Sequence, residues 1–495
     1  MTILPIPEET SEPGLEQVLA EAEAASLSAL RPSERAVLLR AAADALDAAT
    51  EELVDLAMTE TGLTVTRLTG EVARSSGQLR MFAAELDKGD YLEAIIDTAT
   101  DAGRPDIRRM LVPLGPVLVF AASNFPFAFS VPGGDTASAL AAGCPVVVKA
   151  HPGHPRLSRR VGEILADALR NAGAPHGTLA VVHGQSTGVR ALADPRIAAA
   201  AFTGSQAGGR ALLDIVNSRH DPIPFYGELG SLNPAFVTVE ALRARGDEII
   251  DGYVGSFTLG VGQFCTKPGV LFLPAEHGMS HRLVEAVEDC APAAMLNERI
   301  RDAHANERAR LAAIPGMKVL AARDSDGERV GATLLETTVP ELLANSEDAL
   351  AECFGPTSIV VTYENPEELH TAAEVFAGNL TATIHCEIHD QSDPDTRMVG
   401  PLLATLRERV GRVVFNGWPT GVAVTAAMQH GGPYPATTGS VHTSVGTTAA
   451  RRFLRPVCYQ STPSPLLPEA LADDNPLGLP RLVNGERTTS SVRRA

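Results

Sequence analysis

Aromatic residues, paired cysteines and long apolar runs are all scarce in this 495-residue sequence. Only 4% of the residues are aromatic although 44% are hydrophobic, so the interior must consist mostly of Ala, Val, Leu and Ile, as where helices pack on Val-rich strands. No window approaches the roughly 18 consecutive apolar residues of a membrane-spanning helix. The N-terminus also lacks a basic segment followed by an apolar one. We therefore expect an α/β protein without a signal peptide or a membrane span.

The six cysteines are scattered along the chain, and no two of them form a CxxC pair. Such spacing indicates neither a disulfide framework nor a zinc site. It agrees with a reducing compartment, so we expect a cytoplasmic protein with no bound metal.

Acidic residues outnumber basic ones, and the formal net charge is −19. A field of this sign repels nucleic acid and anionic membranes, so neither is expected as a partner. A small anionic substrate is still allowed, because a few Arg or Lys side chains can reverse the sign inside one cleft.

The order of sequence patterns predicts two α/β regions after a helical start. Residues 15–82 are rich in Ala, Leu, Glu and Arg at helical spacing, which predicts two or three helices. Strand-then-helix units follow in the first half, and a second alternating region spans about 231–430. The pattern is typical of doubly wound parallel sheets. The polar, basic tail beyond Pro480 is expected to be loose.

Cys265 is the cysteine best placed for chemistry. It lies in "TLGVGQFCTKPGVLF", between glycines and just before an apolar strand. A thiol in such a loop can be approached by both backbone and ligand, which suits a nucleophile. The alternative is that Cys265 is a small buried hydrophobe, as most cysteines are.

Two further polar residues stand at loops next to apolar strands. Glu228, between glycines in "GELGSLNPAFV", could activate a water molecule, although an acid in a turn is commonly just exposed. Asn124 in "ASNFPFAFSVPGG" follows a strand, so its amide could hold an oxyanion at the carboxyl edge of the sheet. The alternative for Asn124 is an Asx turn.

The segment "AFTGSQAGGRALL" is a candidate phosphate-binding turn. Gly204 and Ser205 stand where a strand meets a helix, so exposed N–H groups and the helix dipole could accept a pyrophosphate. Gly209 would let the strand and the helix approach closely. The ordinary GxGxxG loop does not follow the first strand, so a dinucleotide site needs other support.

Taken together, the motifs resemble the aldehyde dehydrogenase superfamily over nearly the whole chain. They occur in the order "SNFP", "PVVVK", "FTGS", "ELG", "GQFC" and "FGP". Within that superfamily, "GQFCTKPG", "QHGGPYPATT" and "SVGTTAARRFLRPVCYQ" are similar to the 2,5-dioxovalerate (α-ketoglutaric semialdehyde) dehydrogenase group, whose relatives include NADP-dependent fatty aldehyde dehydrogenases.

The resemblance implies a role for each matched residue. Cys265 would be the nucleophile, Glu228 the general base, and Asn124 the oxyanion donor beside the backbone amide of Cys265. The implied cofactor contacts, to NADP or NAD, come from Lys149 (adenosine ribose), Gly204, Ser205 and Gly209 (pyrophosphate turn), Glu352 (nicotinamide ribose), Phe354 and Phe125. The second phenylalanine of "SNFPF", Phe127, would face the substrate.

The residue three positions after Lys149 bears on the choice between NAD and NADP. Many NAD-preferring relatives carry Glu there, whereas this chain has Pro152. Without that carboxylate a 2′-phosphate is not repelled, so we expect NADP to be tolerated, with Arg190 as a possible partner of the phosphate.

The implied reaction is the oxidation of an aldehyde to a carboxylate through a thioester on Cys265, most specifically of 2,5-dioxovalerate to 2-oxoglutarate. A dicarboxylic semialdehyde needs a cation for its distal carboxylate, and the helical segment "EVARSSGQLRMFA" offers Arg74, Gln78 and Arg80. The alternative is that these side chains face solvent or a partner subunit. A fatty or other aliphatic aldehyde is the alternative substrate, and a Cys-dependent acyltransferase or hydrolase without a redox cofactor is the alternative class.

The resemblance also implies a domain plan. We expect a cofactor domain at 1–104 and 121–230, a catalytic domain at 231–435, and a small β arm at 105–120 and 450–490 through which the chain forms a homodimer or homotetramer.

Overall fold

The computed structural model describes residues 5–100, 103–388 and 390–492. Its backbone contacts divide the chain into two compact units. Unit 1 comprises Met1–Thr203, Ala211–Tyr226 and Val445–Ala495, and unit 2 comprises Gly204–Arg210 and Gly227–Ser444. The domain plan expected from the resemblance stays a prediction, and residues 1–4 and 101–102 of its first segment lie outside the described residues.

Unit 1 begins with more helices than the sequence pattern predicted. They are α1 (Glu12–Ala24), α2 (Pro32–Ala48), α3 (Thr50–Thr61) and α4 (Val65–Lys88). Pro32 starts α2, and Gly62 ends α3 in the left-handed conformation. Only Ala49 separates α2 from α3. Because Ala is the best helix former, this break left no signal in the sequence.

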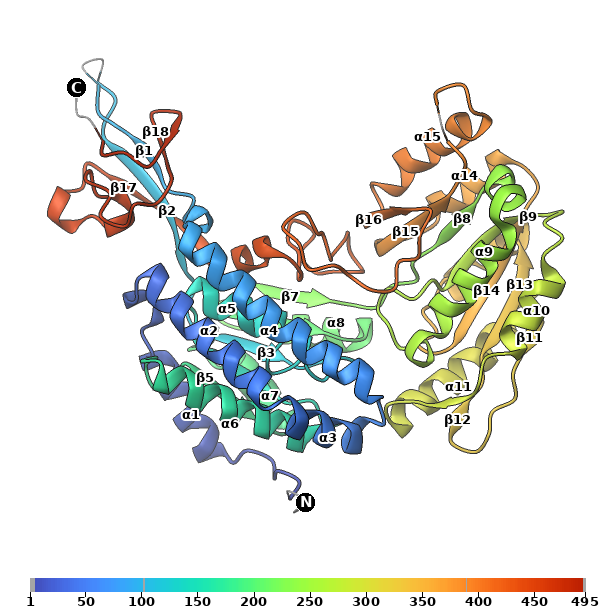
Figure 1. The fold of residues 1–495 in the computed structure, drawn as a ribbon, viewed down its shortest axis with the longest axis horizontal. Coiled ribbons are helices and arrows are strands. Elements are labelled where there is room, and N and C mark those ends of the chain that lie inside the picture. The colour runs from blue at the N-terminus through green and yellow to red at the C-terminus, as the bar shows by residue number, and fades with distance from the viewer. Residues whose placement is uncertain (1–4, 101–102, 389, 493–495) are drawn as a thin grey trace. The chain divides into compact units, whose positions relative to one another are not determined.

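The main sheet of unit 1 has the strand order β5-β4-β3-β6-β7 (Figure 1). Its strands are β3 (Val117–Phe120), β4 (Val146–Lys149), β5 (Leu179–Val182), β6 (Ala199–Thr203) and β7 (Phe225–Glu228). Its helices are α5 (Gly134–Ala142), α6 (Pro155–Asn171), α7 (Gln185–Ala193) and α8 (Gln206–Asn217). Neighbours among β3, β4, β5 and β6 are parallel, as the strand-then-helix rhythm predicted.

Alternate residues of strand β3 pack into two different hydrophobic cores. Val117 and Val119 pack with α2, α4, α5 and α6, whereas Leu118 and Phe120 pack with α1 and α7. Successive side chains of a strand point to opposite faces. Both faces of the sheet are therefore covered by helices, which explains why its strands are largely apolar up to their last residues, such as Lys149 and Glu228.

A second five-stranded sheet of unit 1 has the order β17-β2-β1-β18-β19. Its strands are β1 (Ile95–Asp97), β2 (Ile107–Pro113), β17 (Leu454–Gln460), β18 (Arg481–Val483) and β19 (Glu486–Thr488). The expectation of a loose tail beyond Pro480 is wrong for the described residues, because the tail supplies two strands. The side chain of Arg481 is buried and donates to the carbonyls of Ala472 and Ser490.

Unit 2 contains a sheet in the order β11-β13-β14-β9-β8-β15-β16, parallel except for β11. Its strands are β8 (Ala235–Val237), β9 (Val270–Pro274), β11 (Lys318–Ala322), β13 (Thr333–Thr338), β14 (Thr357–Tyr363), β15 (Asn379–His385) and β16 (Val410–Phe415). A separate ribbon pairs β10 (Ala293–Ala294) with β12 (Arg329–Val330). Its helices are α9 (Val239–Thr258), α10 (Ser280–Glu288), α11 (Glu298–Ala312), α12 (Val339–Ala344), α13 (Ser346–Ala349), α14 (Pro366–Glu374) and α15 (Pro394–Leu406).

This sheet, too, is covered on both faces. Phe236 and Phe272 pack with α12, α14 and α15, while Val237 and Leu273 pack with α9 and α10. The predicted fold class, α/β with two parallel-sheet units and a small β sheet, is thus confirmed. No helix among the described residues has the length and apolar character to cross a membrane.

Candidate active site

Glu228 ends strand β7 and is held by its backbone on two sides. Its carbonyl accepts from the N–H of Gly204 at 3.0 Å, and the next residue, Leu229, donates to Ala436 at 2.7 Å. Its side chain is buried, with 4% exposed. The alternative reading, a surface acid in a turn, does not describe this residue.

Cys265 lies in the turn between η3 (Leu259–Gly262) and β9. The amide of Asn233 fixes this turn by donating to the carbonyls of Cys265 at 2.8 Å and Lys267 at 3.0 Å. Gly262 has a positive φ, and a Cβ there would lie 2.1 Å from the carbonyl oxygen of Gly355. The glycine of "GQFC" is thus required by a close backbone approach.

His430 is a third member of the site, and the sequence analysis did not single it out. Its N–H donates to the hydroxyl of Thr443 at 2.9 Å, and its carbonyl accepts from the N–H of Ser444 at 2.8 Å. These two hydrogen bonds join the segment around His430 to the segment around residues 443–444 within the long loop after β16. Its imidazole is 1% exposed.

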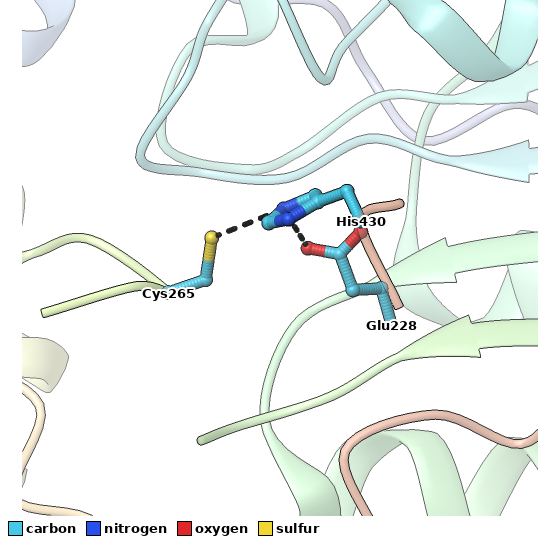
Figure 2. Close-up of side chains that lie close together, drawn as sticks. All are labelled: Glu228, Cys265 and His430. Atoms are coloured by element: carbon cyan, nitrogen blue, oxygen red, sulfur yellow. Dashed lines mark hydrogen bonds and ion pairs between the residues drawn. The ribbon is translucent and has the colours of Figure 1, made fainter. Parts of the chain in front are cut away.

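The side chains of Cys265, His430 and Glu228 converge in unit 2 (Figure 2). Sγ of Cys265 lies 3.6 Å from Nε2 of His430, and the same nitrogen lies 2.9 Å from Oε1 of Glu228. The hydroxyl of Ser444 donates to the other carboxylate oxygen of Glu228. A thiol, an imidazole and a carboxylate therefore stand within proton-transfer reach of one another.

The surroundings of Cys265 favour its neutral form. Burial raises the pKa of the thiol well above its usual value, and the nearby carboxylates of Glu228 and Glu352 raise it further. A thiolate is the nucleophilic form. The thiol must therefore lose its proton to a neighbouring base as it reacts.

Glu352 and Lys267 lie close to the cysteine turn. Lys267 is buried and donates to the carbonyls of Cys353 at 2.6 Å and Thr357 at 2.7 Å, and burial lowers its pKa. Burial raises the pKa of Glu352 to about 7, against the opposing effects of Lys267 and the N–H of Ser231. The site thus contains a carboxyl group that changes charge near neutral pH.

The "FTGS" turn begins helix α8. The hydroxyl of Ser205 accepts from the N–H of Gly208 at 3.2 Å, and Gly204 and Ser205 are exposed while Gly209 is buried. The predicted strand-to-helix junction is therefore present. Contact with a pyrophosphate stays a prediction. Phe354, further along unit 2, is half-buried beside Met295, Ile300 and Val330.

The predicted adenosine contacts lie in unit 1. Lys149 ends β4, and its side chain packs so closely on α7 that a Cβ at Gly188 would lie 2.8 Å from it. Its pKa is lowered, chiefly by burial. Pro152 is exposed in the turn before α6. Arg190 forms an ion pair with Glu12, which would have to open before Arg190 could bind a phosphate.

The loop that carries Asn124 is held by helix α4. Arg67 donates to the carbonyl of Asn124 at 2.6 Å, and its guanidinium lies 4.6 Å from the centre of the Phe125 ring. Glu71 pairs with Arg67 at 3.0 Å and accepts from the N–H of Phe127 at 3.3 Å. The side chain of Phe127 belongs to the core of unit 1, so a substrate contact by Phe127 would require the loop to change.

The three proposed substrate residues of α4 differ in their surroundings. Gln78 is buried and Arg74 is half-buried, whereas Arg80 is exposed and pairs with Asp44 and Asp47 at 2.6 and 2.7 Å. Arg80 therefore already has two carboxylate partners. Arg74 and Gln78, four residues apart, share a face of the helix, as predicted.

Comparison with known proteins decides the family. The model of the aldehyde dehydrogenase family matches residues 3–440. The chain belongs to the aldehyde dehydrogenase family. It is 45% identical over 464 residues to α-ketoglutaric semialdehyde dehydrogenase 2 of Azospirillum brasilense, covering 91% of this chain and 87% of that protein. It is 44% identical over 447 residues to α-ketoglutaric semialdehyde dehydrogenase of Acinetobacter baylyi, covering 88% and 84%.

Solved structures agree with this aldehyde dehydrogenase fold. The crystal structure of PnpE in complex with nicotinamide adenine dinucleotide has a TM-score of 0.77 at 22% identity, covering 91% of this chain and 90% of that one. The resemblance stated from the sequence motifs is thus confirmed.

The residues that sequence reasoning missed in this dehydrogenase share one property, which is that they act through contacts between segments far apart in the chain. They are Asn233, Lys267, His430, Arg67 and Glu71. His430 stood in a quoted motif, "QHGGPYPATT", as the polar residue before a Gly pair. That position was its only signal.

Proposed function

We propose that this aldehyde dehydrogenase oxidises α-ketoglutaric semialdehyde (2,5-dioxovalerate) to 2-oxoglutarate, with NAD or NADP as the hydride acceptor. The observation that carries the chemistry is the half-buried Cys265 residue, whose thiol lies 3.6 Å from His430, while the imidazole of His430 lies 2.9 Å from Glu228. The two α-ketoglutaric semialdehyde dehydrogenases that are 44–45% identical to this chain support the substrate.

The first step is attack on the aldehyde carbon by the sulfur of Cys265. Because the pKa of this thiol is raised, its proton must leave as the C–S bond forms, and the carboxylate of Glu228, which interacts with the thiol and with Nε2 of His430, is the base within reach. Glu228 then passes this proton to solvent before hydrolysis begins. The adduct is a tetrahedral alkoxide. Asn124 and the backbone N–H of Cys265 are the donors we propose for it. When bound, the coenzyme would accept the hydride that leaves the former aldehyde carbon, so that the alkoxide becomes a thioester on Cys265.

The second step is hydrolysis of that thioester. A water molecule loses a proton to Glu228 and attacks the acyl carbon, and the acid leaves as the C–S bond breaks. The sulfur of Cys265 then recovers a proton. The hydrogen bond from Ser444 to Glu228 orients the carboxylate while its other oxygen faces His430.

Each unit, taken by itself, contains described residues that fit one part of a nicotinamide coenzyme. In unit 2 the N-terminus of α8 is open at Gly204 and Ser205, which suits a pyrophosphate. In unit 1 Lys149 stands at the carboxyl end of β4, and both Lys149 and Arg159 lie near enough to His183 to lower its pKa. The positive charges of Lys149 and Arg159, with Pro152 in place of a carboxylate, support tolerance of a 2′-phosphate. His183 adds no charge at neutral pH, because its pKa is lowered to about 4.

For the distal carboxylate of the substrate we propose Arg74 and Gln78. Arg80 is the weaker candidate, because Asp44 and Asp47 already neutralise its charge. A cation at this point would favour a dicarboxylic semialdehyde over a long-chain aldehyde.

A substrate panel tests the proposal. Purified protein is assayed by coenzyme reduction with 2,5-dioxovalerate and with a long-chain aldehyde, each with NAD and with NADP. We expect kcat/KM to be higher for 2,5-dioxovalerate and NADP to be accepted. Higher efficiency with the long-chain aldehyde would assign the alternative substrate, and thioester hydrolysis without coenzyme reduction would assign the alternative class. Cys265→Ala serves as the inactive control.

We further propose a homodimer or homotetramer that works in the cytoplasm. Support for assembly comes from β17, an edge strand whose residues Arg455, Pro456 and Cys458 are exposed. The scattered cysteines support a reducing compartment.

A further inference from the structure

We propose that Cys265, His430 and Glu228 also form a binding site for Zn²⁺, whose occupation blocks the thiol reversibly. Within the part of the chain that the structure describes, these three are the one group of His, Cys and carboxylate side chains whose ligand atoms all lie within 4.8 Å of one another. The inference concerns inhibition and does not depend on which aldehyde the enzyme oxidises.

The three ligand types are those that Zn²⁺ selects. Thiolate, imidazole and carboxylate bind it at about 2.3, 2.0 and 2.0 Å, in tetrahedral geometry. Such bond lengths place sulfur and nitrogen about 3.5 Å apart, and nitrogen and oxygen about 3.3 Å apart. The observed separations are 3.6 Å for Sγ to Nε2 and 2.9 Å for Nε2 to Oε1. These two separations therefore differ from the tetrahedral values by no more than a few tenths of an ångström, and the third pair of ligand atoms lies within 4.8 Å.

The ligands are held in place before any metal arrives. Asn233 fixes the Cys265 turn, Thr443 and Ser444 fix the backbone of His430, and β7 ends at Glu228. The hydroxyl of Ser444 also orients the Glu228 carboxylate, as outer partners of metal ligands do. Because these contacts are formed already, metal binding loses little conformational entropy.

Three protein ligands leave the fourth tetrahedral position open for water or a substrate oxygen. The Cys265 thiol releases its proton to solvent when it binds the metal, and no electron is transferred. Zinc affinity should therefore rise with pH, because protons compete for the same sulfur and nitrogen atoms. A sulfur bound to Zn²⁺ cannot attack an aldehyde, so the metal and acylation exclude each other.

The spacing of the three ligands explains why no zinc site was expected from the sequence. Residues 228, 265 and 430 come from three loops, far from any short Cys/His motif. Only the fold brings them together.

The first experiment measures the thiol directly in the intact protein. Cys265 is alkylated with iodoacetamide with or without Zn²⁺, and the modification rate is followed by peptide mass spectrometry. We expect Zn²⁺ to slow alkylation of Cys265 at least tenfold, EDTA to restore the rate, and Mg²⁺ to have no effect. Half-buried Cys290 is the internal reference, whose rate should not change. Equal rates with and without Zn²⁺ would overturn the proposal.

The second experiment identifies the ligands. Co²⁺ should bind at one equivalent per chain and produce a thiolate-to-metal charge-transfer band in the wild-type protein. His430→Asn and Glu228→Gln should each weaken binding at least tenfold. The matched control is His281→Asn, because exposed His281 lies 3.4 Å from Glu285 with no thiol in the pair. Absence of the band, or equal affinity in His430→Asn and His281→Asn, would overturn the site. Neither readout requires turnover, so the proposed aldehyde oxidation is tested separately.

Discussion

The surroundings of Glu228 have opposing effects on the negative charge of its carboxylate. It is buried, which disfavours a charge, yet Ser444 donates to one of its oxygens and the imidazole of His430 lies beside the other. Ser444 occupies one oxygen of the Glu228 carboxylate, so the oxygen beside His430 is the one that can accept a proton in the thiol site. That arrangement suits a base that acts on water after the thiol has been acylated.

Glu228→Gln should separate the two halves of the reaction. An amide keeps the shape and a hydrogen-bond acceptor but is no base, so hydrolysis should slow by about 100-fold or more. The acylated protein should then accumulate, and intact-mass measurement after mixing with aldehyde and coenzyme detects it. The control is Glu240→Gln, an acid of α9 that pairs with Arg243 on the surface. Undiminished turnover in Glu228→Gln would contradict the assignment.

If Glu352 contacts the coenzyme, as we propose, coenzyme affinity should depend on pH. Its pKa is raised to about 7, so the carboxyl group is neutral below that pH and charged above it. A ribose hydroxyl donates more strongly to the charged form. If Glu352 holds the ribose, the coenzyme Kd should fall several-fold as the pH rises from about 6 to 8. Titration by protein fluorescence measures this, and Glu352→Gln should flatten the dependence. The same slope in both proteins would exclude Glu352 as its cause.

At the scale of elements, unit 1 depends on a buried ion pair between α5 and η4 (Thr447–Phe453). Arg452 and Asp135 lie 2.7 Å apart, with 4% and 9% of their side chains exposed. The guanidinium also lies 5.0 Å from the centre of the Phe453 ring. This pair connects the last segment of the chain to the first helix after the Asn124 loop.

Asp135→Ala should destabilise unit 1. Loss of the carboxylate leaves the Arg452 charge buried, which costs about 3 kcal/mol or more. Urea unfolding followed by circular dichroism should show an earlier transition. Glu12→Ala is the control, because its exposed ion pair with Arg190 contributes at most about 1 kcal/mol. Equal midpoints for the two variants would mean that the buried pair contributes no more than the exposed one.

At the scale of the whole molecule, assembly into oligomers depends on the strand edges that one chain exposes. Among the strands of residues 5–100, 103–388 and 390–492, β17 pairs with β2 on one side and with no strand on the other. An unpaired strand edge can pair with another chain, and a two-fold contact places the same residue on both sides of the axis.

A charge on this edge should weaken the proposed dimer. Cys458→Glu puts a carboxylate on the exposed edge of each copy, and the two would repel across a two-fold axis. Light scattering after size exclusion should then give a lower mass than for the wild type at equal concentration. Val441→Glu adds the same charge at a residue of unit 2 that is 85% exposed and should change nothing. If both variants keep the wild-type mass, β17 does not form the interface.

Much of this molecule is encoded in short-range patterns. The strand-then-helix rhythm of the first half, to which β3, β4 and α6 belong, was predicted from local residues, because burial on both faces demands continuous apolar runs and an amphipathic helix needs one apolar face. The α2–α3 break was missed because Ala49 carries no breaker signal. The ordered tail was missed because the partners of Arg481 are carbonyls that only the folded chain presents.

Sequence alone determined the α/β class, the family motifs and the two loops that carry Cys265 and Glu228, since glycines, strand patterns and motif order are local properties. Tertiary structure alone decided that His430 lies between that thiol and that carboxylate and that Arg67 and Glu71 hold the Asn124 loop. It also decided that the three side chains of the thiol site have the spacing of a metal ligand set. The reason is physical: distances between residues hundreds of positions apart are set by how sheets and loops pack, and no local pattern records them.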